Sequence, residues 1–106
     1  MDAHAVNVEV MMPAVVRLGD QDTGHGCYPP RANNGSCSTV FADGKLIHRK
    51  GDSWNVHSCP DNPPHDATLS GGSGTVMVEG AAVGRVGDSV SCGGAAAQGS
   101  STVFAG

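Results

Sequence analysis

Three histidines and one cysteine are the side chains in this 106-residue chain whose types and positions fit metal ligation. They are His25, His57, His65 and Cys92. Imidazole nitrogen and thiolate sulfur form the donor set that Zn²⁺ prefers, and four such donors complete a tetrahedral shell. Calcium and magnesium would instead require oxygen donors. The four residues therefore predict one structural zinc site, although ligand type alone does not exclude copper or iron.

Three of these ligands stand at equivalent positions of an internal repeat. The motif Arg-x-Gly-Asp occurs at 17–20, 49–52 and 85–88. One candidate ligand, His25, His57 or Cys92, follows each copy at nearly the same distance. Symmetry-related loops would bring these three donors to a common axis. The recurrence of the Asp at the end of each copy favours a structural role, such as capping the turn that follows the glycine.

The fourth ligand lies outside the repeat. We expect a long, Pro-rich loop from Cys59 to Asp66, and His65 within it is the candidate. Cys59 is the alternative fourth ligand. Cys27 and Cys59 are themselves repeat-equivalent, so they are also candidates for a disulfide or for small buried apolar residues. Synthesis in the cytoplasm makes metal binding by cysteine more common than a persistent disulfide.

The remaining histidines and cysteine have no predicted chemistry. We interpret His48 as an ordinary strand residue, His4 as an exposed residue of the N-terminal tail, and Cys37 as a residue beside a turn. Trp54 and Tyr28 are interpreted as packing residues.

The elements that must position the ligands are short β-hairpins. Thr-Val-Phe or Thr-Val-Met runs begin at Thr39, Thr75 and Thr102. Asp43-Gly44 and Glu79-Gly80 follow the first two runs, and such pairs favour two-residue hairpin turns. Return strands are expected over 45–49 and 81–86. No useful 3.6-residue period is present, so the chain is predicted to be all-β.

The repeat is incomplete at both ends of the chain. Its first copy lacks the opening strand and its last copy lacks the closing strand, so a circular, pseudo-threefold arrangement would let the two ends complete each other. Residues 1–12 lie outside the repeat and are predicted to be an N-terminal tail or an extra strand. Residues 13–106 are predicted to form one domain.

Composition limits the core and the partners. Hydrophobic residues make up 39% of the chain and aromatic residues only 4%. A structural zinc contributes about 10–16 kcal/mol in small zinc-finger peptides, comparable with the roughly 5–15 kcal/mol net stability of an ordinary domain.

A net charge of −4 argues against nucleic acid as a partner. There is no recognisable signal peptide and no 18-residue apolar run, so we expect synthesis in the cytoplasm.

These motifs together resemble the PAAR-repeat family over about residues 13–106. The resemblance is carried by Met12-Pro13-Ala14, by 19–26 (Gly-Asp-x-x-Thr-Gly-His-Gly), by the Thr-Val-Phe/Met runs, by 80–88 and by Cys92-Gly93-Gly94. It implies a small cone of short β-hairpins with pseudo-threefold repeats. It also implies one structural zinc near the apex, held by three histidines and one cysteine, which by motif position are His25, His57, His65 and Cys92.

The resemblance further implies a mechanical function. Family members cap the trimeric β-helical spike of a contractile injection machine, one tip per trimer, and help it pierce the target envelope. The expected location is the tip of a phage tail, a tailocin or a type VI secretion spike, without an attached effector domain. No enzymatic activity is expected. The alternative is a small zinc-dependent hydrolase, and a disulfide scaffold built on Cys27–Cys59 is a third possibility.

Overall fold

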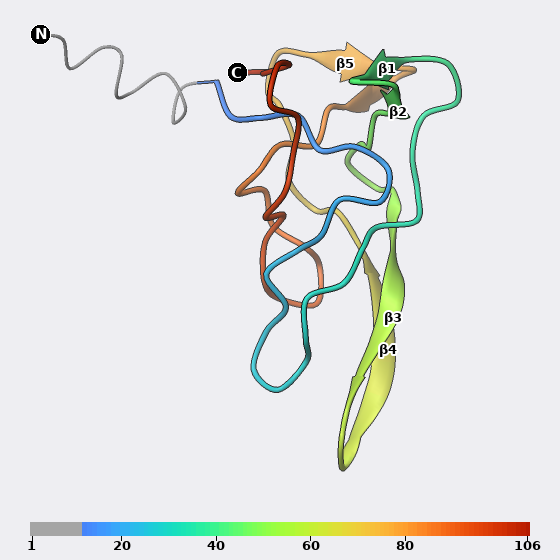
Figure 1. Cartoon of the computed structure of the whole chain (residues 1–106), viewed down its shortest axis with the longest axis vertical. Coiled ribbons are helices and arrows are strands. Elements are labelled where there is room, and N and C mark those ends of the chain that lie inside the picture. The colour runs from blue at the N-terminus through green and yellow to red at the C-terminus, as the bar shows by residue number, and fades with distance from the viewer. Residues whose placement is uncertain (1–11) are drawn as a thin grey trace, which may run out of the picture.

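The computed structural model describes residues 12–106, so the predicted tail or strand over residues 1–12 falls almost wholly outside it, as does His4. Six strands form three two-stranded antiparallel sheets, and no helix occurs in the described part of the chain (Figure 1). The strands are β1 (Phe41–Ala42), β2 (Lys45–Leu46), β3 (Ser53–Cys59), β4 (Asn62–Thr68), β5 (Met77–Val78) and β6 (Ala81–Ala82). Within these residues nothing forms a helix capable of spanning a bilayer. The all-β prediction is confirmed.

Two of the predicted hairpins form with the predicted turns. β1 pairs with β2 through Asp43-Gly44, and β5 pairs with β6 through Glu79-Gly80. The turn residues have φ values of 53° and 78° in the first hairpin and 51° and 82° in the second. Positive φ at both central positions is the requirement of a type I′ turn, which matches the twist of the flanking strands.

A third, equivalent hairpin is assembled from the two ends of the chain. Ala14 forms an antiparallel bridge with Phe104, and the Ala105 N–H donates to the Pro13 carbonyl at 3.0 Å. The Val15 N–H donates to the Val103 carbonyl at 3.0 Å. The first and last repeats therefore complete each other, as the circular arrangement predicts.

The three units meet around a closed ring of backbone hydrogen bonds. Val16, His48 and Gly84 precede the arginine of each Arg-x-Gly-Asp copy. The Val16 N–H donates to Gly84 at 2.9 Å, the Gly84 N–H to His48 at 2.9 Å, and the His48 N–H to Val16 at 3.0 Å. A ring of this kind joins each unit to the next in one rotational sense, so it marks the pseudo-threefold axis.

The return strands are shorter than predicted. Regular pairing ends at Leu46 in β2 and at Ala82 in β6, although strands to 49 and 86 were expected. The next residues change partner: Ile47 bridges to Arg17 of the preceding unit, and Val83 bridges to Arg49. The Ile47 and Val83 N–H groups still donate to Val40 and Val76 of their own hairpins, at 3.1 and 3.0 Å. The His48 and Gly84 N–H groups, one residue later, donate to a neighbouring unit, so each return strand shares its backbone bonds between its own hairpin and the next unit.

The Arg-x-Gly-Asp motif closes each unit in the same way. The Oδ2 of Asp20 accepts from the backbone N–H of Arg17 at 2.9 Å and from its Nε at 2.9 Å. Asp52 and Asp88 make the same pair of bonds to Arg49 and Arg85. The intervening glycines have φ values of 91°, 92° and 96°, a region that L side chains rarely adopt. The predicted structural role of the three Asp residues is confirmed.

The segment expected as a Pro-rich loop is instead the longest hairpin of the described chain. β3 and β4 pair antiparallel with a bulge between Trp54 and His57 and another between His57 and Cys59. Pro63 and Pro64 lie inside β4. Neighbouring strand residues turn their backbone nitrogens to opposite sides, so only one of the two prolines faces the open edge of the two-stranded sheet. The other is tolerated because both lie opposite the register shift between His57 and Cys59, where the ladder is interrupted.

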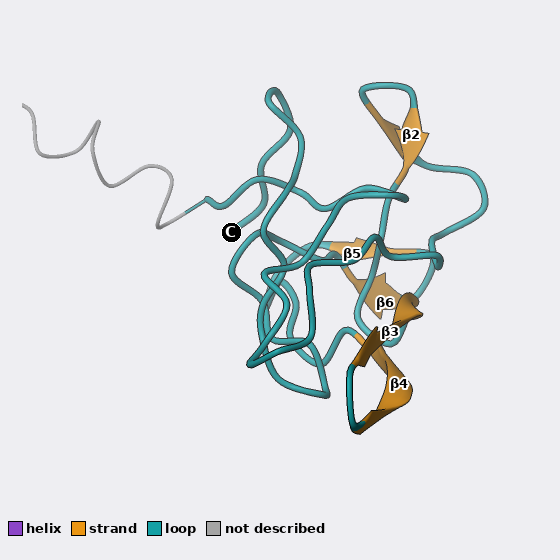
Figure 2. Ribbon diagram, turned by 60° about the horizontal axis from the view of Figure 1, so that its bottom comes forward, coloured by secondary structure: helices purple, strands orange, loops and turns teal. Residues whose placement is uncertain are grey.

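The molecule has a broad end and a narrow end (Figure 1). The short hairpins β1–β2 and β5–β6 and the C-terminus lie at the broad end, whereas the turn of β3–β4 and the 22–31 loop project at the narrow end. Turning that end towards the viewer shows that most of the chain is loop and turn (Figure 2). The core is correspondingly small and splits into two clusters, one around Ile47 and Val83 and the other around Trp54 and Leu69.

Candidate metal centre

The structure brings the four predicted ligands together towards the narrow end. His25 comes from the 22–31 loop, His57 from β3, His65 from β4, and Cys92 from the turn after Val90. Their possible ligand atoms all lie within 4.8 Å of one another, so the group could hold a metal ion. His57 is buried, and the other three are half-buried.

The imidazole rings present Nε2 atoms to one another. The Nε2 of His65 lies 3.0 Å from that of His25 and 2.7 Å from that of His57. The Nδ1 of His57 lies 2.9 Å from the Pro29 carbonyl, which can only accept, so Nδ1 carries the proton. In the neutral ring the Nε2 of His57 therefore offers a lone pair to the site, the form a metal requires.

The charge state of His65 also suits a ligand. Loss of hydration lowers the pKa of His65, and the nearby His57, His25 and Arg31 lower it further. A neutral imidazole is consequently favoured at this position, and only the neutral ring can donate its lone pair to a metal.

The donor set and spacing fit a tetrahedral ion. With Zn–N bonds of about 2.0–2.1 Å, two nitrogens of a tetrahedral shell stand about 3.3 Å apart. The separations of 2.7 and 3.0 Å at His65 are a few tenths of an ångström shorter. A tetrahedral ion would therefore require these nitrogens to move apart by a few tenths of an ångström.

Local structure explains the convergence. The register of β3 against β4 places His57 opposite His65, and the bulges on either side of that pair set both rings towards the same face. The turn that carries Cys92 lies close against the His25 loop. A Cβ on Gly94 would be only 2.7 Å from the Gly24 carbonyl oxygen. Only glycine permits this approach, and it brings the sulfur to the imidazoles.

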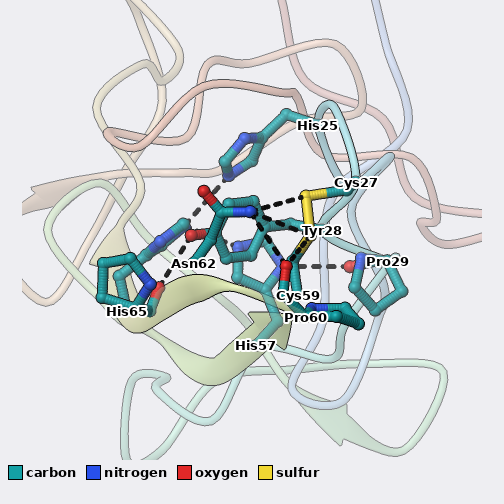
Figure 3. The surroundings of a disulfide bond; sticks show 10 residues. His25, Cys27, Tyr28, Pro29, His57, Cys59, Pro60, Asn62 and His65 are labelled. Carbon is teal, nitrogen blue, oxygen red and sulfur yellow. Dashed lines mark hydrogen bonds between the residues drawn. A yellow bond between two sulfur atoms is a disulfide. The ribbon is translucent and has the colours of Figure 1, made fainter.

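A disulfide joins Cys27 to Cys59 beside this group (Figure 3). Each of these cysteines stands two residues after a candidate ligand, His25 or His57. Of the alternatives left open by the sequence, the structure has the disulfide, and Cys59 is not the fourth member of the ligand group. The bond links the 22–31 loop to β3 and so ties together two segments that carry ligands.

Tyr28 packs over the three imidazoles (Figure 3). Its ring centroid lies 4.9 Å from those of His25 and His57 and 4.3 Å from that of His65. Its hydroxyl donates to the Pro63 carbonyl at 2.7 Å and thereby bonds the loop to β4. Tyr28 is thus a packing residue, as predicted.

His48 and Cys37 lie apart from the ligand group. His48 is fully buried in the axial ring, between rather than within the strands, so its interpretation as an ordinary strand residue is wrong. Burial lowers the pKa of His48, and its Nε2 has no hydrogen-bond partner among residues 12–106. Cys37 is a buried core residue whose thiol contacts the Val40 carbonyl at 3.0 Å.

The sequence reasoning missed Arg31 and Asp22. Both are buried and ion-paired, and Arg31 reaches the sulfur of Cys92. Neither residue type recurs at the corresponding positions after the other two Arg-x-Gly-Asp copies, so the repeat gave no indication of them. Trp54, interpreted as packing, is almost fully buried in the second core cluster.

Comparison with known proteins agrees with this architecture. The family model of the PAAR motif matches residues 31–98, which is more than half of the chain. A search of curated proteins gives no match. The match spans His57, His65 and Cys92 and begins after His25. On this evidence the chain belongs to the PAAR-motif family.

Proposed function

We propose that this protein is the zinc-stabilised tip of a contractile injection machine, such as a phage tail or a type VI secretion system. It caps the trimeric β-helical spike and helps the spike pierce the target envelope. The family match supports a spike-tip role. The observation that carries the proposal further is the closed pseudo-threefold ring at residues 16, 48 and 84, because a single chain with this symmetry can meet three identical subunits equivalently.

The broad end presents suitable side chains for that contact. Phe41, Met77 and Phe104 occupy equivalent positions in the three units, and they are 60%, 61% and 41% exposed. Single exposed apolar side chains are common on protein surfaces, so the supporting feature is their recurrence at the equivalent position of all three units. Three equivalent apolar groups around one axis fit a partner that offers three equivalent pockets, and the partner we propose is the blunt end of the spike trimer.

The metal has a structural role in this proposal. His25, His57, His65 and Cys92 would hold one Zn²⁺, and a shell of four protein donors keeps no position for water. A catalytic zinc needs such a position, so the geometry does not favour a hydrolase. Zinc would add a further link between the four ligand-bearing segments of a chain whose core is limited to two small clusters.

Metal analysis and melting curves test the zinc centre. We expect one zinc per chain and a large fall in melting temperature after strong chelation. Replacement of His57 by Ala should reduce the zinc content. The buried His48 is the matched control, because its replacement by Gln should lower stability while leaving the zinc content at one. A metal-free chain with an unchanged melting point would contradict the proposal.

Copurification with the spike tests the partner. We expect one chain per spike trimer, and Phe41→Ser, Met77→Ser and Phe104→Ser should each weaken the complex. Val56, which is 62% exposed on β3, is the control, since Val56→Ser removes a similarly exposed apolar group at the narrow end. Three chains per trimer would refute the symmetry argument.

A further inference from the structure

Arg31 is a buried cation at the centre of the ligand-bearing segments. The residue is only 5% exposed, and its side chain carries a full positive charge. Burying a guanidinium is costly unless its nitrogens find partners. Its Nε donates to Oδ2 of Asp22 at 3.2 Å, Nη1 to the carbonyls of Asn55 and His65 at 2.8 and 3.2 Å, and Nη2 to the sulfur of Cys92 at 2.9 Å. Every nitrogen of the guanidinium is therefore occupied.

These bonds reach all four segments that carry candidate ligands. Cys92 is contacted through its sulfur and His65 through its own carbonyl. Asn55 stands two residues before His57 on β3. The fourth connection runs through Asp22, whose Oδ1 accepts from the Gly24 N–H at 3.0 Å, immediately before His25. No other side chain with these connections is found among residues 12–106.

The bond to sulfur has a chemical consequence. Cys92 is the only one of the four candidate ligands that is anionic when it binds a metal. A donor to a thiolate withdraws electron density from the sulfur, and such outer hydrogen bonds orient the ligand and tune the metal. Asp22 balances the charge of Arg31 through a buried ion pair at 3.2 Å. Asp22 thus compensates the buried charge of Arg31, while the Nη2 of Arg31 donates to the Cys92 sulfur and can polarise it.

We infer that Arg31, held in place by Asp22, is the positioning residue of the metal centre: its guanidinium orients and polarises the Cys92 sulfur and holds the four ligand segments together. This inference rests on the proposed metal centre. It concerns the tuning of that centre, and the repeat plays no part in it.

Titration with Co²⁺ tests this role, because a thiolate bound to cobalt gives a sulfur-to-metal charge-transfer band. We expect Arg31→Met to weaken Co²⁺ binding about 10–100-fold and to shift that band. Arg31→Lys keeps the charge but not the planar fork, so it should recover only part of the affinity. Arg85→Met is the matched control. Arg85 pairs with Asp88 at 3.1 Å and contacts no candidate ligand, so its loss should leave the band and the affinity unchanged.

A second variant covers the case in which Arg31→Met fails to fold because Asp22 is left buried and unpaired. The double variant Asp22→Asn/Arg31→Met removes both charges together and should show the same loss of affinity and the same band shift. Failure of the wild-type chain to bind Co²⁺ would reject the metal centre itself. Wild-type binding with an unchanged band in the folded Arg31 variants would overturn the inference alone, whether or not their affinity falls, because Arg31 would then not act on the sulfur.

Discussion

At the scale of single residues, the axial ring admits side chains of very different size. Val16, His48 and Gly84 are equivalent, yet only the His48 ring is large, and it is fully buried. A Cβ on Gly84 would lie 2.7 Å from Cδ2 of Leu69 and 2.9 Å from the His48 carbonyl oxygen. We therefore expect Gly84→Ala to destabilise the fold by about 1–3 kcal/mol, as overpacking of a tight core does. Urea unfolding measures the loss.

Gly74 provides the matched control for that substitution. A Cβ there would meet nothing within 4 Å, and the φ of Gly74 lies outside the left-handed region. Gly74→Ala should be neutral or stabilise by about 0.4–1 kcal/mol, because it restricts the unfolded chain. Equal effects of the two substitutions would show that contact at the axis is not the cause.

The carboxylate of Glu79, at the broad end, should make the stability of the fold depend on pH. Oxygens of Glu79 accept from the hydroxyl and backbone N–H of Thr39 and of Ser38, and these bonds lower the pKa of Glu79 from 4.5 to about 2. The stabilisation is fully present above pH 4.5 and is lost as the pH falls through about 2. Thermal melts between those values should show a falling melting temperature. In Glu79→Gln the fall should be smaller, whereas Asp61→Asn, a substitution at the β3–β4 turn, should leave it unchanged.

At the scale of elements, the disulfide joins two of the four segments that carry candidate ligands, the 22–31 loop and β3. Cys27 and Cys59 are separated by 32 residues, and closing a loop of that length stabilises a fold by roughly 3–4 kcal/mol in the chain-entropy model. We expect Cys27→Ser/Cys59→Ser to lose about this much in urea unfolding with a chelator present. Cys37→Ser is the control, since Cys37 is buried but free. Finding all four thiols reactive in the denatured, unreduced chain would contradict the bond.

The elements also show what the sequence could predict. The hairpins at Asp43-Gly44 and Glu79-Gly80 were predictable because a type I′ turn has a strong local signature. The β3–β4 hairpin was not, because Pro63 and Pro64 indicate a loop unless the strand is known to have both a free edge and a bulge opposite them. The convergence of His25, His57 and Cys92 followed from the repeat. Arg31 could not be found, because its role comes from contacts between segments distant in the chain.

At the scale of the whole molecule, hydrogen bonds at the broad end join the three units in a closed circuit, in which each unit bonds to the next. The Glu79 carboxylate bonds to Ser38 and Thr39 of one unit. The Asp43 carboxylate bonds to Ser100 and Thr102 of the next. The remaining loop, at Ser73 and Thr75, donates its hydroxyls to the backbone oxygen of Gly106. Each unit therefore supplies an acceptor to a neighbour, and Gly106 holds the position that the turn acid has in the other two.

This circuit predicts that the fold tolerates a change in the order of its units. Pro13 and Ala105 are joined by a backbone bond at 3.0 Å, as a hairpin turn would require. A permuted chain without residues 1–11 could therefore link Ala105 to Pro13 through Asp-Gly, which would replace Gly106 and Met12. Its new termini would lie between Asp43 and Gly44. We expect it to fold, with a far-UV spectrum like that of the parent and a melting temperature within a few degrees.

The control permutant opens between Val16 and Arg17, beside the axial ring. Its new termini would carry charges next to the fully buried Val16, whose N–H and carbonyl join the other two units at 2.9 and 3.0 Å. It should not fold, because a break there disturbs all three units rather than one turn. If the two permutants were equally unstable, the three hairpins at the broad end would not be equivalent members of this circuit. The order of the repeats along the chain would then matter as much as their symmetry.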